Sequence, residues 1–332
     1  MPIYASHLPP QTFYAPGPES HDVCISTCSG ALYLHSRVLI MFSPWFAASM
    51  SRLWWKEQAP TLKYRYSYTL DVDADGISTL LPPCQKEEEE IEYEPLAPDP
   101  ELSTNFHRLY TQLFSAFYRL PLTILDHHSL SALIDLADQY QCLPTVADSI
   151  RSTLFERPTL DREIRDAPTR FLAIGHKLRS ARIFREAFIH CVGLRTTADA
   201  PTPQIAAMIT KETYRLEQLV ATAMRRFLGL SGFGEYTRHV RSLVRGELGR
   251  CFDQYPEAGK EGRLFRMIAE NPFTAEERGE ERDWGGLQYQ ARGLVAKVKA
   301  LAGALVVNNL RLKQEMDYLT CAELKEDALP WL

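Results

Sequence analysis

Few side chains in the sequence have the type and spacing that metal binding or proton transfer requires. His127 and His128 are adjacent, and adjacent residues on a helix point about 100° apart, so both rings cannot easily bind one ion. Cys24 and Cys28 fall on one face of a predicted strand, but no second pair stands at zinc spacing. We therefore favour a solvated helix start for the histidines, and core or surface thiols over a metal site for the cysteines.

The patterns of common catalytic sites are also missing from the sequence. It contains no Gly-x-Gly-x-x-Gly, Gly-x-x-x-x-Gly-Lys, Gly-x-Ser-x-Gly or His-Glu-x-x-His segment, and no pair of carboxylates stands out for general acid and base catalysis. His35 precedes an apolar helix, where a ring is more often a hydrogen-bonded core residue than a base. We expect no enzymatic activity, no catalytic residue, no cofactor and no metal ion.

The composition is that of a chain long enough for two globular domains. It has 332 residues, of which 45% are apolar, with no run of about 18 apolar residues and no N-terminal export signal. Seven cysteines at irregular gaps are unlike a secreted disulfide framework, so we expect an intracellular protein, cytoplasmic or nuclear, without membrane contact. A net charge of −5 argues against bulk attraction to nucleic acid or to an anionic membrane.

The elements around His35 are the most clearly marked in the chain. Residues 33 to 50 predict the end of a strand, a short apolar helix over residues 38 to 42, and a second helix. Ser43 has the side chain of a helix N-cap, Pro44 follows where a missing N–H costs nothing, and Phe46 continues at helical spacing.

This order of elements resembles the opening of a BTB/POZ domain. That family has an Asp at the first strand, a hairpin, a His at the end of the second strand, an apolar helix and then Ser-x-x-Phe, which here are Asp22, His35, Ser43 and Phe46. A helix predicted over residues 106 to 118, followed by Leu-Pro-Leu and two further helices, is similar to the rest of the domain. The chain is most similar to fungal BTB proteins of unassigned function, whose helical tail carries a segment like residues 171 to 187.

The resemblance implies an α+β fold at residues 21 to 156, a small and mostly antiparallel sheet covered by helices, followed by an all-α region at residues 157 to 332. It also implies a protein–protein interaction module, an adaptor or scaffold that forms a homodimer through the first helices. The candidate interface consists of apolar and aromatic residues, of which some in the first helices are expected to lie in the core: Val38, Leu39, Phe42, Trp45, Trp54 and Trp55.

The resemblance leaves two of the family's features in doubt. Some relatives bind a cullin scaffold as substrate adaptors of a ubiquitin ligase, but residues 102 to 104 lack the acidic signal that this role uses. Family dimers often pair the first-strand Asp with a basic residue directly after the His, and here Ser36 takes that position, with Arg37 one residue later. A cullin is therefore only a weakly implied partner.

Several segments are predicted from composition and spacing alone. Residues 1 to 20 hold five prolines and are expected to be an unpacked tail. Strict alternation over residues 64 to 72 predicts a hairpin that returns through residues 77 to 81. Residues 82 to 104 form a proline-rich, acidic insertion, which we interpret as a solvated loop in preference to a docking element for a basic partner.

The region after residue 158 is predicted to be helical to its end, with helices near 205 to 228 and 234 to 254. Residues 287 to 321 have heptad spacing, which fits a coiled coil with Asn308 in its seam or an amphipathic helix packed on its own domain; we favour the packed helix.

A basic stripe raises one alternative function. Arg238, Arg241 and Arg245 share helical spacing and could contact phosphates, which suggests a nucleic-acid-associated regulator. Such a stripe is more often a solvated or ion-paired helix face, and nucleic acid is the less favoured partner.

Overall fold

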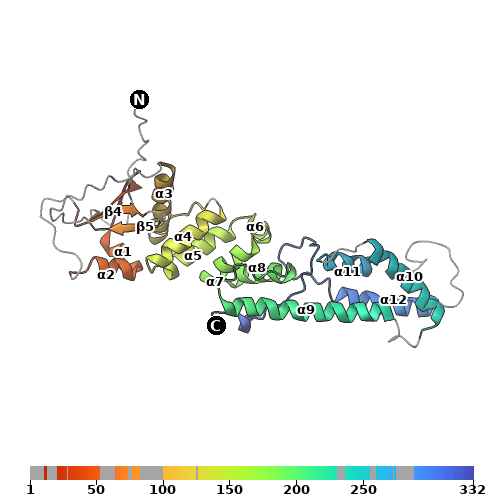
Figure 1. Cartoon of the computed structure of the whole chain (residues 1–332). Coiled ribbons are helices and arrows are strands. Elements are labelled where there is room, and N and C mark those ends of the chain that lie inside the picture. Colours follow the sequence, from red (N-terminus) through yellow and green to blue (C-terminus); the bar gives the residue numbers. More distant parts are fainter. Residues whose placement is uncertain are drawn as a thin grey trace, which may run out of the picture. The chain divides into compact units, whose positions relative to one another are not determined.

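The computed structural model describes residues 11–12, 21–27, 29–52, 64–73, 77–82, 100–124, 126–229, 236–254, 259–271, 273 and 288–332. The chain divides into two compact units, Met1–Pro158 and Thr159–Leu332, whose elements are labelled in Figure 1. Each unit has its own buried core. No helix in these ranges is long and apolar enough to cross a membrane.

The first unit is built on a mixed sheet. Its described strands are β1 (Gln11–Thr12), β2 (Val23–Thr27), β3 (Gly30–Leu34), β4 (Tyr66–Val72) and β5 (Ser78–Leu81), in the order β1-β3-β2-β4-β5. The hairpins β2–β3 and β4–β5 are antiparallel, while β2 pairs with β4, and β1 with β3, in parallel. The α+β class predicted from the sequence is confirmed, but the sheet is mixed and not mostly antiparallel.

The strand β1 lies within the segment that the sequence predicted to be an unpacked tail. Gln11 and Thr12 pair with Leu32 and Tyr33 at the edge of the sheet. For these two residues the prediction is wrong, because a neighbouring strand edge supplies backbone partners that local composition does not reveal.

The helices of the first unit are α1 (Ser36–Phe42), α2 (Pro44–Ser49), α3 (Pro100–Phe117), α4 (His127–Gln139) and α5 (Leu143–Phe155). Alternate strand residues point into the core, and the inward faces of α3, α4 and α5 complete it. The fully buried large side chains of this unit are Tyr68, Tyr110, Tyr140, Phe46 and Phe114. The Tyr140 hydroxyl lies 2.8 Å from that of Tyr110 and accepts the Leu80 N–H at 3.1 Å, so α3, α4 and β5 share one buried polar contact.

The second unit contains no strand among its described residues and is mostly helical as far as Gly303. It contains α6 (Leu160–Asp166), α7 (Pro168–Lys177), α8 (Ala181–Gly193), α9 (Pro203–Gly229), α10 (Arg238–Gln254), α11 (Glu261–Glu270), α12 (Gln288–Gly303) and a final 3₁₀ turn, Glu326–Ala328. The helices α7 and α8 pack closely on each other, and α12 contacts α9, α10 and α11. At Gly175 a Cβ atom would collide with the backbone of Phe184, so this glycine permits the approach of α7 to α8.

The heptad segment does not form one continuous helix. The helix α12 ends at Gly303, and irregular chain follows as far as the 3₁₀ turn. Leu305 and Leu319 are nevertheless buried, and the Asn308 amide donates to the Gln314 carbonyl at 3.0 Å, which closes a loop. The coiled-coil prediction, and the packed helix beyond residue 303, are wrong, because regularly spaced apolar residues fill the core equally well from an irregular segment.

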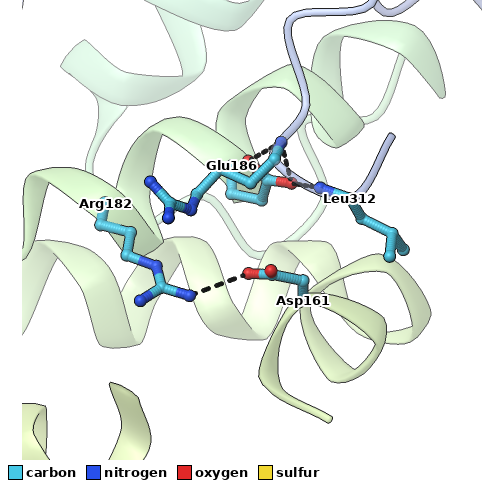
Figure 2. A network of polar contacts seen from close by, with 5 residues as sticks. Asp161, Arg182, Glu186 and Leu312 are labelled. Carbon is cyan, nitrogen blue, oxygen red and sulfur yellow. Dashed lines mark hydrogen bonds and ion pairs between the residues drawn. The ribbon is translucent and has the colours of Figure 1, made fainter. Parts of the chain in front are cut away.

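Buried polar contacts fasten this irregular segment to α8. Glu186 is 2% exposed, and its carboxylate accepts the backbone N–H groups of Arg311, at 2.9 and 3.0 Å, and of Leu312, at 3.4 Å (Figure 2). One turn along the helix, His190 Nδ1 lies 2.6 Å from the Tyr318 hydroxyl. The C-terminal segment therefore belongs to the fold of the second unit.

The stability of the second unit should fall between pH 7 and pH 5 because His190 must stay neutral. Burial, with a smaller effect from Arg165, lowers the pKa of His190 to about 4, against 6.5 for an ordinary histidine. Below pH 6.5 the unfolded chain gains a proton that the folded chain does not bind. The free energy of unfolding therefore keeps falling until the pH reaches the pKa of His190 in the folded chain. We expect His190 to account for about 2 kcal/mol between pH 7 and pH 5.

Urea unfolding of the wild type and of a His190→Gln variant at both pH values isolates this contribution. The variant should lose about 2 kcal/mol less than the wild type over the interval. Equal losses in the two proteins would show that His190 does not carry the pH dependence.

Candidate interaction surface

The start of α1 is held by the carboxylate of Asp22, the residue directly before β2. The Ser36 N–H donates to Asp22 Oδ1 at 2.7 Å, and the Ser36 hydroxyl donates to Asp22 Oδ2 at 2.5 Å. The side chain of the N-cap residue, His35, makes no capping hydrogen bond. The Asp22 carboxylate instead accepts the free N–H of Ser36 at the start of the helix. A negative charge at a helix N-terminus is favourable, and this pair fixes how α1 is rotated on the sheet.

His35 lies in the core and is 7% exposed. Its backbone N–H donates to the Tyr118 hydroxyl at 2.9 Å, and its Nδ1 lies 2.9 Å from the same oxygen. The hydroxyl therefore accepts the backbone N–H and shares a second hydrogen bond with Nδ1. Burial raises the pKa of Tyr118 to about 12, so its hydroxyl stays protonated at neutral pH. This arrangement ties β3 to the end of α3 and leaves His35 a structural residue.

Ser43 and Phe46 join α2 to α4. The Ser43 hydroxyl accepts the Phe46 N–H at 3.2 Å as the N-cap of α2, and donates to the Tyr140 carbonyl at 2.6 Å. Phe46 is fully buried, and its ring stacks on Tyr140 with centroids 5.5 Å apart. Both residues of the Ser-x-x-Phe motif thus serve the core.

The predicted interface residues divide into three groups. Leu39 is fully buried, so its assignment to a contact surface is wrong: it is the residue of α1 that faces the core. Val38, Phe42 and Trp45 are partly exposed. Trp54 and Trp55 lie outside the described residues.

The most exposed apolar residues of α1 are two that the sequence argument did not select. Ile40 is 42% exposed and Met41 is 73% exposed. On a helix of two turns, the residues one and two positions after a buried residue lie well away from it, so the orientation of Leu39 turns them to solvent. We call Val38, Ile40, Met41 and Phe42 the α1 patch.

A groove begins where the α1 patch ends. It has a volume of about 640 Å³, and Phe42, Phe117 and Leu120 supply apolar lining, while Asp148 and Ser149 of α5 supply polar lining. Arg119, at φ 54°, reverses the chain after α3 and brings Leu120 to the rim, where it is 42% exposed. The exposed apolar surface of α1 therefore continues beyond the helix.

The basic stripe lies on α10 of the second unit. Arg238 and Arg245 are exposed and Arg241 is partly exposed. Arg245 donates to the Gly229 carbonyl at 3.3 Å and so caps the last turn of α9. One of the three arginines thus has a structural role.

The structure brings together no metal site among the side chains that it describes. The rings of His127 and His128 lie 4.4 Å apart at the start of α4, where Asp126 accepts the Ser129 N–H at 2.7 Å as the helix N-cap. Cys24 is partly buried, and Cys28 lies outside the described residues.

Comparison of the chain with models of protein families, with curated proteins and with solved structures finds no match. The resemblance to the BTB/POZ family stays a prediction from the sequence motifs.

Replacing Asp22 should destabilise the first unit through the start of α1. Asp22→Ala leaves the Ser36 N–H without its acceptor, and we expect the free energy of unfolding to fall by about 1–3 kcal/mol. Asp71→Ala, an exposed carboxylate on β4, is the control and should change it by less than about 0.5 kcal/mol.

A double-mutant cycle with Ser36→Ala, followed by urea unfolding, measures the coupling between the two residues. We expect the two losses to be strongly non-additive, because both variants remove the same hydroxyl–carboxylate contact. Additive losses would contradict the role given to this pair.

Proposed function

We propose that the chain is a protein–protein interaction adaptor, with a BTB/POZ-like unit at residues 21–156 whose α1 patch contacts a second copy of the chain. The order of Asp22, His35, Ser43 and Phe46 along the sequence supports the family assignment. The exposure of the α1 patch supports the choice of surface.

The observation that carries the proposal is the apolar composition of α1. Five consecutive residues, 38 to 42, are apolar, yet only Leu39 among them is fully buried. Removing a side chain such as Ile40 or Met41 from water contributes roughly 1.5–3 kcal/mol. In a two-fold dimer each such residue acts twice, so a small patch gives a stable contact.

The proposal does not include cullin binding. Relatives that bind a cullin carry an acidic signal near the start of the third helix, and residues 102 to 104 of this chain lack it. The side chains of these three residues lie outside the described part of the structure. A partner other than the second copy would bind to the helical second unit of the adaptor.

Sedimentation velocity on the full chain tests the dimer. The wild type should sediment as a species of twice the chain mass of 37.9 kDa at micromolar concentration. The double variant Ile40→Glu and Met41→Glu should raise the dissociation constant about 100-fold or more, because two charges would enter each half of the contact.

The matched control is Ile77→Glu, which places a charge on a residue of the first unit that is 56% exposed and lies outside the α1 patch. It should leave the dissociation constant unchanged. A wild type that stays monomeric at 100 μM, or a control that weakens the dimer as much as the double variant, would contradict the proposal.

A second candidate function is nucleic-acid binding by the second unit, and one observation favours it. The bond from Arg245 to the Gly229 carbonyl places the stripe on α10 beside the end of α9, where Arg225 and Arg226 are exposed. Exposed arginines at the end of α9 therefore lie beside the stripe on α10, although the chain as a whole is acidic.

Salt titration of DNA and RNA binding tests this second candidate. If the stripe contacts phosphates, a triple variant with Arg238, Arg241 and Arg245 each changed to Gln should lower the slope of log Kd against log salt by about 2–3. Arg108→Gln with Arg162→Gln is the control and should leave the slope unchanged. No salt-dependent binding by the wild type would exclude nucleic acid as the partner.

A further inference from the structure

The outward face of α1 is apolar in its middle and cationic at its first turn. Arg37, Ile40 and Met41 are the exposed residues of this helix, and positions three and four apart lie on the same helix face. Arg37 therefore stands one turn before the two most exposed residues of the α1 patch. A second copy that covers the patch has to accommodate a guanidinium group at this end of the helix.

A contact between two copies extends beyond the α1 patch. A few apolar side chains supply most of the binding energy of an interface, but a specific interface takes roughly 20–30 residues from each partner. Helix α1 has seven residues, and Leu39 among them is fully buried. Surface beside the helix must therefore complete the contact, and the groove that begins at Phe42 continues the exposed apolar surface in that direction.

The groove carries a carboxylate close to the C-terminal end of α1. The Thr145 hydroxyl donates to the Phe42 carbonyl at 3.4 Å, which places the start of α5 beside that end of the helix. Asp148 lines the groove one turn further along α5, and its side chain is 79% exposed although it also pairs with Arg151. A carboxylate has about four lone-pair sites, so Asp148 can accept a second guanidinium group.

We propose that two copies pack their α1 helices antiparallel, so that Arg37 of the second copy enters the groove beside Asp148; this inference rests on the α1 contact proposed above. In an antiparallel two-fold pair the first turn of one helix lies beside the last turn of the other, which is where the groove begins. In a parallel pair the two Arg37 side chains would face each other, and like charges repel. Charge therefore favours the antiparallel arrangement.

The ion pair gives the contact its orientation and its specificity. Two-fold symmetry repeats every contact, so both copies insert Arg37 at the same time. A pair at the rim of an interface adds little affinity but fixes the register and disfavours mispaired chains. The apolar lining beside Asp148, Phe42 and Phe117, contacts the aliphatic part of the arginine. A chain with a similar α1 but no carboxylate in the groove would therefore pair less well with this one.

Charge reversal on the full chain, read by sedimentation velocity, tests the pairing. Arg37→Asp and Asp148→Arg each bring like charges together at both ends of the contact, so each should raise the dimer dissociation constant about tenfold or more. An equimolar mixture of the two variants should dimerise as the wild type does, because each chain then offers the charge that the other needs. Asp138→Arg, an exposed carboxylate on α4 outside the groove, is the matched control and should change nothing.

The outcomes separate this inference from the proposed function. Recovery of the dimer in the mixture supports the pairing and also shows that both variants fold, since a misfolded chain is not repaired by a second variant. A wild-type dimer that neither reversal weakens, or a mixture that stays as weak as its components, would overturn the pairing and leave the α1 contact standing. A monomeric wild type would instead contradict the proposed function itself.

Discussion

A helix of two turns cannot bury five consecutive apolar residues against one core, and this constraint governs the first unit. The Asp22 carboxylate holds the first turn of α1 through Ser36, so the helix cannot rotate to exchange the residue that it buries. With Leu39 fixed in the core, Ile40 and Met41 must face outward. The same contact that orders the helix thus creates the surface on which the proposed function depends.

In the second unit, polar backbone groups are buried in a segment that is not helical. After α12 ends, the chain has N–H groups that no intrahelical bond satisfies, and Glu186 accepts those of Arg311 and Leu312. Burial raises the pKa of Glu186, although these N–H bonds favour the ionised form, so desolvation outweighs the bonds in this site.

Local patterns made much of the first unit predictable. Alternation identified the two hairpins, and the Ser43-Pro44 pair identified the start of α2, because these signals depend on neighbours in sequence. The parallel pairing of β2 with β4 and the addition of β1 depend on contacts between distant segments, and composition does not encode them. The choice of Leu39 over Met41 failed for a related reason: periodicity fixes relative directions on a helix, not the rotation of the helix on its core.

The second unit shows where spacing misleads. The positions with heptad spacing after residue 303 include the buried residues Leu305 and Leu319, yet they reach the core from irregular chain. The basic stripe was visible in the sequence, whereas the attachment of Arg311 and Leu312 to Glu186 was not, because only the folded chain brings these residues together.

Site-specific photocrosslinking at position 41 of the full chain tests the central claim most directly. If α1 forms a two-fold contact, light should produce covalent dimers whose crosslinked peptides join position 41 to residues 36–46 of a second chain, in proportion to the dimer present at each concentration. A product that contains only one chain, or crosslinks from position 41 that reach a second chain only outside α1 and α2, would contradict the account.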